Sequence, residues 1–240
     1  LIVLLGTWEW TNLAGVGASR TRLALVAGMA VLLALLWLGG AAYAVWPLWL
    51  AAAGWLLNLY WVTQYPHSSQ QWHTTSRRLL MGVWVLLPCW VGFNVLRDSG
   101  AVWLLFVLLL VWTADIGAYF AGRRWGKRKL APRVSPGKSW EGVYGGLAAT
   151  TLLAMLFALW QPLGPMGGVA LVVITAVVTL TSVLGDLFES MLKRYRNIKD
   201  SSQLLPGHGG VLDRIDSLTA AIPIFALFYL QVLSLQVSAL

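Results

Sequence analysis

The feature that most constrains this chain is the length of its apolar runs. Only 11% of its 240 residues are charged, and these are clustered, so long uncharged stretches lie between them. A soluble domain usually carries about 25% charged residues. A run of about 18 or more apolar residues is typical of a membrane-spanning helix, because backbone amides in hydrocarbon must be paired within their own segment. No period-two alternation is evident, which argues against a membrane barrel.

The apolar runs predict an all-α, polytopic membrane bundle. Seven complete membrane helices are expected at about 23–38, 45–62, 79–96, 101–120, 143–160, 168–187 and 218–237, and the end of a truncated helix at 1–10. The chain would form a single membrane domain over 1–240. Within it, 1–120 supplies N-terminal membrane helices, 121–217 the catalytic loops with the helices between them, and 218–240 the last membrane helix.

Basic residues predict the orientation of this bundle. Alternate loops at 11–22, 63–78, 121–142 and 188–217 contain 16 of the 17 Lys and Arg residues, and the loops between them contain only Arg97. Because basic loops stay in the cytoplasm, these four loops are expected there, with the C-terminus in the periplasm. The net charge of +8 then reflects topology and anionic lipid headgroups, not nucleic-acid binding. Topological charges of this kind are expected at Arg20, Arg22, Arg77 and Arg78.

The loop at 121–142 contains Gly137-Lys138-Ser139, which is similar to the end of a phosphate-binding P-loop. A P-loop needs glycine at position 132, where this chain has Pro132, so that motif is rejected. What remains is a turn that presents Ser135, Lys138 and Ser139 beside the start of a helix. Backbone amides and an ammonium group there suit a phosphate, although the loop alone could serve only topology.

The region from 182 to 217 carries the acidic residues of interest. Asp186 is expected near the inner end of a membrane helix, and Glu189, Ser190 and Lys193 follow at i+3, i+4 and i+7, so the four share one helical face. A carboxylate at this depth is costly unless it is paired or coordinated. A salt bridge from Asp186 to Lys193 or Arg194 is the alternative to a metal site.

Residues 205–210, Leu-Pro-Gly-His-Gly-Gly, cannot form regular helix, and three glycines allow close approach of a ligand. His208 alone is weak evidence for a metal ligand, since it could simply form a hydrogen bond within the loop. Asp213, Arg214 and Asp216 then open the last membrane helix. Asp213 and Asp216 are i, i+3 neighbours, but Asp216 could also be only a first-turn carboxylate.

This combination indicates Mg²⁺-dependent phosphoryl or nucleotidyl transfer at the membrane surface, because Mg²⁺ commonly lies between carboxylates and substrate phosphates. Zinc spacing, a serine nucleophile elbow and a GxGxxG motif are absent from the sequence. Another membrane transferase is an alternative, but the array of CDP-alcohol phosphatidyltransferases is missing. A transporter is a second alternative, but it should show related halves with broken helices, and none are evident.

Several of these residues resemble the signature of the phosphatidate cytidylyltransferase (CDP-diacylglycerol synthase) family. The matching positions are Ser190 to Arg194, Lys199-Asp200, Pro206 to Gly210 and Asp213 to Asp216. The resemblance extends to 135–142, to Asp115 with 117–119, and to 8–10, and it is to bacterial members over most of the chain. The resemblance is expected to depart at the front, with a first membrane helix typical of the bacterial family missing from this sequence.

The resemblance implies an enzyme that joins CTP to phosphatidic acid, giving CDP-diacylglycerol and pyrophosphate, at the cytoplasmic face of a bacterial inner membrane. It implies a Mg²⁺ site at Asp186 and Asp213, a second, monovalent cation such as K⁺, a homodimer, and Lys193 as a third catalytic residue. Substrate contacts are expected at Ser135, Lys138, Ser139, Ser190, Arg194, Lys199, His208 and Arg214. Asp115, Glu189 and Asp216 complete the candidate set, although Asp115 could equally be a polar tie inside the bundle.

Overall fold

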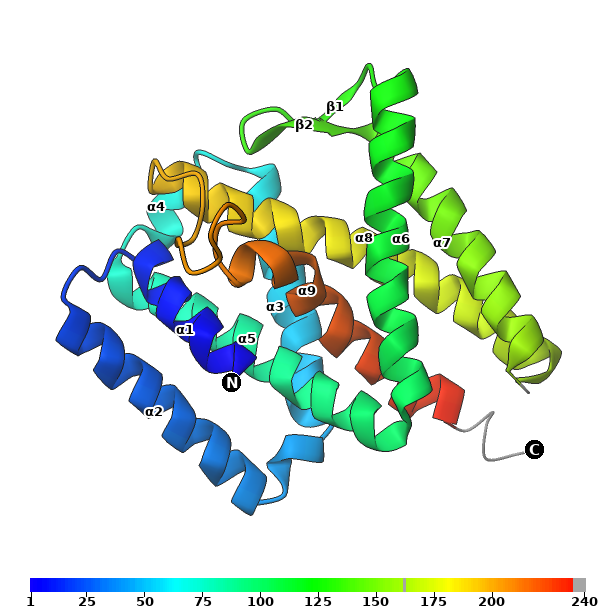
Figure 1. Cartoon of the computed structure of the whole chain (residues 1–240), viewed down its shortest axis with the longest axis horizontal. Coiled ribbons are helices and arrows are strands. Elements are labelled where there is room, and N and C mark those ends of the chain that lie inside the picture. Colours follow the sequence, from blue (N-terminus) through cyan, green and yellow to red (C-terminus); the bar gives the residue numbers. More distant parts are fainter. Residues whose placement is uncertain (162, 235–240) are drawn as a thin grey trace.

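The structure is a computed structural model that describes residues 1–161 and 163–234. It is a bundle of helices with one small sheet (Figure 1). The long helices are α1 (Ile2–Leu13), α2 (Ser19–Leu38), α3 (Trp46–Thr63), α5 (Thr75–Ser99), α6 (Ala101–Trp125), α7 (Trp140–Trp160), α8 (Gly164–Tyr195) and α9 (Leu212–Phe228). Shorter elements are η1 (Ala41–Tyr43), α4 (Ser69–Trp72) and the π-helical η2 (Tyr229–Leu233).

Six helices in the described part of the chain are long and apolar enough to cross a membrane: α2, α5, α6, α7, α8, and α9 together with η2. This finding confirms the all-α membrane bundle. The helix expected at 45–62 is present as α3 but is not among the six, since its four tryptophans, Asn58 and Tyr60 lower its mean hydropathy. The last helix begins at Leu212 instead of 218, and positions 235–237 lie outside the described residues.

Helix ends differ from the expected spans because apolar runs mark only the lipid-embedded part of a helix. Thr74 caps α5 by accepting a hydrogen bond from the Arg77 backbone N–H at 3.4 Å, so that helix starts four residues before position 79. Helix α8 runs to Tyr195, eight residues past position 187, and Asn197 then has a φ of 53°. Asparagine tolerates this left-handed conformation better than most residues. Asp186 therefore lies nine residues before the end of α8.

The loop expected at 121–142 contains a hairpin that hydrophobic patterning does not indicate. Strand β1 (Lys129–Ala131) pairs antiparallel with β2 (Ser135–Ser139), with Lys129 opposite Ser139. Val134, at the hairpin turn, is buried and anchors it to the bundle. Ser139 ends β2 and caps α7, because its Oγ accepts from the Gly142 N–H at 3.2 Å. The orientation of Lys138 is thereby fixed relative to α7.

Small residues allow α6 and α7 to pack closely. A Cβ on Gly145 would lie 2.8 Å from the Gly117 carbonyl oxygen, so a larger residue would force the helices apart. Beneath this contact, the ring of Phe106 lies 4.4 Å from that of Phe157 and 5.6 Å from that of Phe225, measured between centroids. These contacts join α6, α7 and α9 into one core.

Three of the basic segments meet at one end of the bundle, at the upper left of Figure 1, and the α5–α6 turn lies at the opposite end. Arg194 Nε donates to the Val134 carbonyl at 3.2 Å, which joins α8 to the hairpin. The Tyr195 ring lies 4.8 Å from that of Trp72 on α4. Arg78 is more than a topological charge, because it is buried and donates to the Ala14 carbonyl at 2.9 and 3.1 Å.

Candidate active site

Asp186 lies beside a close contact between α8 and α9. A Cβ on the preceding residue, Gly185, would lie 2.5 Å from the Asp216 carbonyl oxygen and 3.1 Å from the Ala220 Cβ. Glycine therefore lets the two backbones touch at this point. The crossing brings the first turns of α9 beside Asp186, and the Asp186 and Asp216 carboxylates are close enough for their charges to interact.

Lys193 is the centre of one buried ion-pair cluster. Its Nζ lies 2.7 Å from Asp213 Oδ1 and 3.3 Å from Glu189 Oε1. The other Asp213 oxygen, Oδ2, accepts from the Ser201 N–H at 2.9 Å, the Ser201 hydroxyl at 2.8 Å and the Gly210 N–H at 2.7 Å. The Asp213 side chain is only 8% exposed, and these charge-assisted bonds offset the cost of its burial.

Lys138 and Asp186 form a second, more open pair. Lys138 Nζ lies 2.6 Å from Asp186 Oδ2, and the Ser190 hydroxyl donates to Oδ1 at 3.1 Å. About a quarter of each side chain in the ion pair is exposed (26% and 29%), so incoming groups can reach it. The interpretation of Asp186 as a partner of Lys193 or Arg194 is therefore wrong: its partner comes from the hairpin.

Glu9 is a residue of this site that the sequence analysis did not select. It is fully buried, and its carboxylate accepts from the Ser202 hydroxyl at 2.6 Å and from the backbone N–H groups of Val211 and Leu212 at 2.8 and 2.6 Å. Glu9 therefore ties α1 to the loop that precedes Asp213. A glutamate within an apolar run is the signal that could have identified it.

Two of the three glycines in the 205–210 turn approach protein carboxylates instead of open space. A Cβ on Gly209 would lie 2.9 Å from Asp213 Oδ2, and one on Gly210 would lie 2.6 Å from Glu9 Oε1. Gly207 has a φ of 72° and open space around it. Gly207 is therefore the one of these three glycines whose backbone a ligand could approach closely, as expected from the sequence. Gly209 and Gly210 instead allow the loop to pack against Asp213 and Glu9.

The remaining residues predicted to contact substrate lie either in the β1–β2 hairpin or in the segment between α8 and the first turn of α9. Arg214 donates to the His208 carbonyl at 2.6 and 3.1 Å, and His208 Nδ1 lies 3.1 Å from the Pro206 carbonyl, so both support the loop conformation. Lys199 is exposed. Ser135 begins β2.

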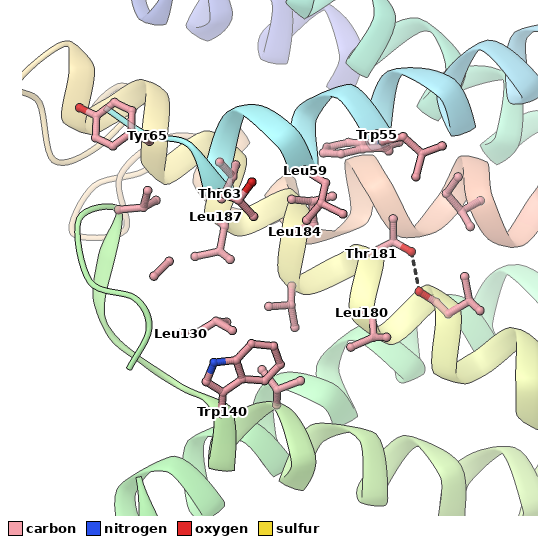
Figure 2. Close-up of a pocket in the computed structure, with 18 of the residues that line it drawn as sticks. Trp55, Leu59, Thr63, Tyr65, Leu130, Trp140, Leu180, Thr181, Leu184 and Leu187 are labelled. Atoms are coloured by element: carbon pink, nitrogen blue, oxygen red, sulfur yellow. Dashed lines mark hydrogen bonds between the residues drawn. The ribbon is translucent and has the colours of Figure 1, made fainter. Parts of the chain in front are cut away.

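A large apolar pocket of about 840 Å³ lies between α3, α8 and the hairpin (Figure 2). Trp55 and Leu59 of α3 lie beside Leu184 and Leu187 of α8 along one side of it, and Leu130 and Trp140 lie on the opposite side. Its rim includes the exposed apolar side chains of Leu56, Leu59, Trp140, Val177 and Leu180. The pocket therefore opens toward the side of the bundle, where lipid chains lie in a membrane.

A smaller pocket of about 380 Å³ lies between α6, α7 and the hairpin, and its lining includes Asp115, Arg123, Lys138 and Ser139. We call it the polar pocket. It shares a wall with the apolar pocket, because both are lined by Leu130, Val143 and Val183. Lys138 thus connects the polar pocket to Asp186.

Carboxylates at Asp186 and Asp213 provide the hard oxygen ligands that Mg²⁺ prefers. Each already faces a cationic group, Lys138 at 2.6 Å and Lys193 at 2.7 Å. Within the described residues, no set of three or more His, Cys, Asp or Glu side chains is arranged to hold a metal ion. Mg²⁺ bound by phosphates needs only one or two protein carboxylates, so the residues fit a cation that arrives with a substrate.

Comparison with known proteins identifies the family of the chain. The sequence profile of the cytidylyltransferase family matches residues 1–232. The chain belongs to the cytidylyltransferase family. It is 52% identical over 233 residues to the phosphatidate cytidylyltransferase of Pseudomonas aeruginosa, covering 94% of this chain and 83% of that protein. The phosphatidate cytidylyltransferase of Haemophilus influenzae is 42% identical over 97% of this chain and 88% of its own length. A Bacillus subtilis relative of the same name is 43% identical over 58% of this chain and 51% of its own length.

Proposed function

We propose that this chain transfers the cytidylyl group of CTP to phosphatidic acid, giving CDP-diacylglycerol and pyrophosphate. The observation that carries the proposal is the pair of adjoining pockets, one apolar and one polar, together with Lys138, which lines the polar pocket and pairs with Asp186. A reaction between a membrane lipid and a water-soluble nucleotide needs such a pair. The relatives named phosphatidate cytidylyltransferase support the choice of substrates.

In the proposed reaction, an oxygen of the lipid phosphate attacks the α-phosphorus of CTP and pyrophosphate leaves. The lipid phosphate is already anionic near neutral pH, so a strong general base is not needed. The obstacle is repulsion between this anion and the triphosphate. Lys138 and Lys193 are placed to reduce it, because both ammonium groups sit beside carboxylates at this site and can contact phosphate oxygens instead.

Asp186 and Asp213 would hold a Mg²⁺ ion, which would neutralise phosphate charge and favour in-line geometry. Glu9 positions Asp213 through the backbone of residues 211 and 212. The Asp213 oxygen that faces Lys193 is the one available to a cation, since Oδ2 already accepts three hydrogen bonds. A monovalent cation such as K⁺ beside Mg²⁺ and a homodimer are further parts of the proposal.

The site is proposed to face the cytoplasm from a bacterial inner membrane. This placement rests on the clustering of 16 basic residues in four loops, three of which meet at one end of the bundle. CTP would enter from that end, and the lipid would enter from the side through the apolar pocket.

The direct test is to incubate purified protein with CTP, phosphatidic acid and Mg²⁺ and to measure CDP-diacylglycerol and pyrophosphate. Equal amounts of the two products are expected, and none when either substrate is left out. Turnover with ATP equal to that with CTP would refute the assignment. Mixed vesicles that contain diacylglycerol in place of phosphatidic acid provide the matched negative control.

A further inference from the structure

Asp115 is the acidic residue of the polar pocket whose role the proposed reaction leaves open. It lies on α6, ten residues before Trp125, and Asp186 lies nine residues before the end of α8. At about 1.5 Å per residue, both are roughly 14 Å from the ends of their helices. Asp115 is exposed to the pocket, and within the described residues its carboxylate forms no hydrogen bond or ion pair. An ionisable group at this depth is costly unless a ligand or partner meets it.

We infer that Asp115 recognises the 4-amino group of cytosine, and that the polar pocket holds the base of CTP. This inference rests on the proposed function and names the residue that selects the nucleotide. A carboxylate is the common protein acceptor for the cytosine amino group. Uracil presents a carbonyl oxygen at the same position, which the carboxylate would repel.

The other polar groups of the pocket suit the rest of the cytosine edge. Cytosine offers an amino donor beside two acceptors, a ring nitrogen and a carbonyl oxygen. Ser139 lines the pocket and carries a hydroxyl donor for one of these acceptors. The charge of Asp115 also interacts with those of Lys138 and Asp186, so all three groups are close together. A base held by Asp115 would therefore leave its phosphates beside the proposed catalytic pair.

Backbone atoms fix the wall of the polar pocket on the side of α7. A Cβ on Gly142 would lie 3.0 Å from the Ala118 carbonyl oxygen, and one on Gly146 would lie 3.0 Å from that of Ala114. Helices α6 and α7 are thus in direct contact and cannot separate easily to admit a larger base. The volume of about 380 Å³ suits a pyrimidine nucleoside.

The test compares three nucleotides on wild type, Asp115→Ala and Asp115→Asn: CTP, UTP, and the triphosphate of the pyrimidin-2-one riboside, which lacks the 4-amino group. Wild type is expected to prefer CTP over both others. Asp115→Ala should lower kcat/KM for CTP at least about tenfold, which corresponds to about 1.4 kcal/mol. It should change kcat/KM for the pyrimidin-2-one triphosphate less than about twofold, because that nucleotide lacks the amino group that Asp115 contacts. In Asp115→Asn, an amide can donate to the uracil carbonyl, so the preference for CTP over UTP should shrink at least about tenfold.

Asp98→Asn is the matched control, since Asp98 lies in the last turn of α5, where it pairs with Arg97. It should keep wild-type kcat/KM for all three nucleotides. Size-exclusion profiles and melting temperatures in detergent show which variants fold. If Asp115→Ala does not fold, the nucleotide preference of Asp115→Asn tests the role of Asp115. Unchanged nucleotide ratios, or an equal loss with all three nucleotides, would overturn the role of Asp115. Failure of the wild type to use CTP would instead overturn the proposed function.

Discussion

The carboxylate of Glu9 accepts a hydrogen bond from the backbone N–H of Leu212 at 2.6 Å, although 203 positions separate the two residues. The first N–H groups of a helix have no partner within it, and α9 has no side-chain cap of its own at Val211. Glu9 supplies that cap from another helix. The carboxylate also interacts favourably with the positive end of the α9 dipole.

Glu9→Ala should therefore lower both stability and turnover. Its removal would leave buried N–H groups unpaired, at a cost of about 1–3 kcal/mol each, and would release the loop before Asp213. We expect a lower melting temperature in detergent and a fall in kcat larger than any change in the KM for CTP. Glu9→Gln should recover part of the stability because its amide oxygen still accepts. Wild-type melting and turnover in Glu9→Ala would contradict this role.

Lys138→Met should lower turnover at least about tenfold, which corresponds to roughly 1.4 kcal/mol of lost transition-state stabilisation. Its melting temperature should change little, because both partners of the Lys138–Asp186 pair are partly exposed and the gain from such a pair is small. Steady-state kinetics at low CTP is the measurement. Lys129→Met is the control, because Lys129 is a basic residue of the same hairpin and is the first residue of β1. Full turnover in Lys138→Met would show that this lysine does not contact substrate phosphates.

Asp186→Asn and Asp213→Asn should both lose Mg²⁺-dependent turnover, but only Asp213→Asn should lose much stability. From the sequence, both variants are expected to fold nearly as well as wild type, but the structure changes this for Asp213. Asp213→Asn removes the charge of one of the two carboxylates that face Lys193 in the buried cluster, so this variant should lose stability, by at most the roughly 3–5 kcal/mol that breaking a buried pair costs. Turnover across a Mg²⁺ titration should be lost, or should need much more Mg²⁺, in both variants. Unchanged Mg²⁺ dependence would remove that residue from the proposed metal site.

Gly185→Ala should destabilise the α8–α9 crossing. The added Cβ would lie 2.5 Å from a backbone oxygen, which cannot move without shifting α9, and such overpacking costs about 1–3 kcal/mol. Gly28→Ala is the matched control, because nothing lies within 4 Å of its added Cβ. A drop in melting temperature is expected for Gly185→Ala alone. Equal melting of the two variants would mean that the crossing can relax.

The orientation is testable by cysteine labelling in intact cells. Gln203 is exposed in the loop before α9, and the native Cys89 is buried and should react slowly. We expect Gln203→Cys to resist a reagent that does not cross the inner membrane and to react after lysis. Strong labelling from outside would reverse the proposed topology.

The sequence indicates the fold well because each helix is long and apolar, and lipid leaves its backbone few alternatives. It also locates Asp186, Asp213 and Lys193 in one region. It does not identify the partner of Asp186, since Lys138 reaches it only through a short hairpin whose pairing leaves no hydrophobic pattern. Contacts between residues far apart in the chain, such as that of Glu9 with Leu212, depend on tertiary packing that no local pattern encodes.

The cap that Glu9 provides also sets an order of events during synthesis. Glu9 leaves the ribosome 202 residues before Val211, an interval of roughly 10–40 seconds at about 5–20 residues per second. Throughout that time, the backbone N–H groups of Val211 and Leu212, which donate to the Glu9 carboxylate in the folded protein, have not yet been synthesised. Helix α1 can therefore form its contacts with Val211 and Leu212 only after the start of α9 has been translated. A ribosome stalled before residue 211 would hold a chain that contains α1 to α8 and yet lacks both Asp213 and the backbone groups that Glu9 caps.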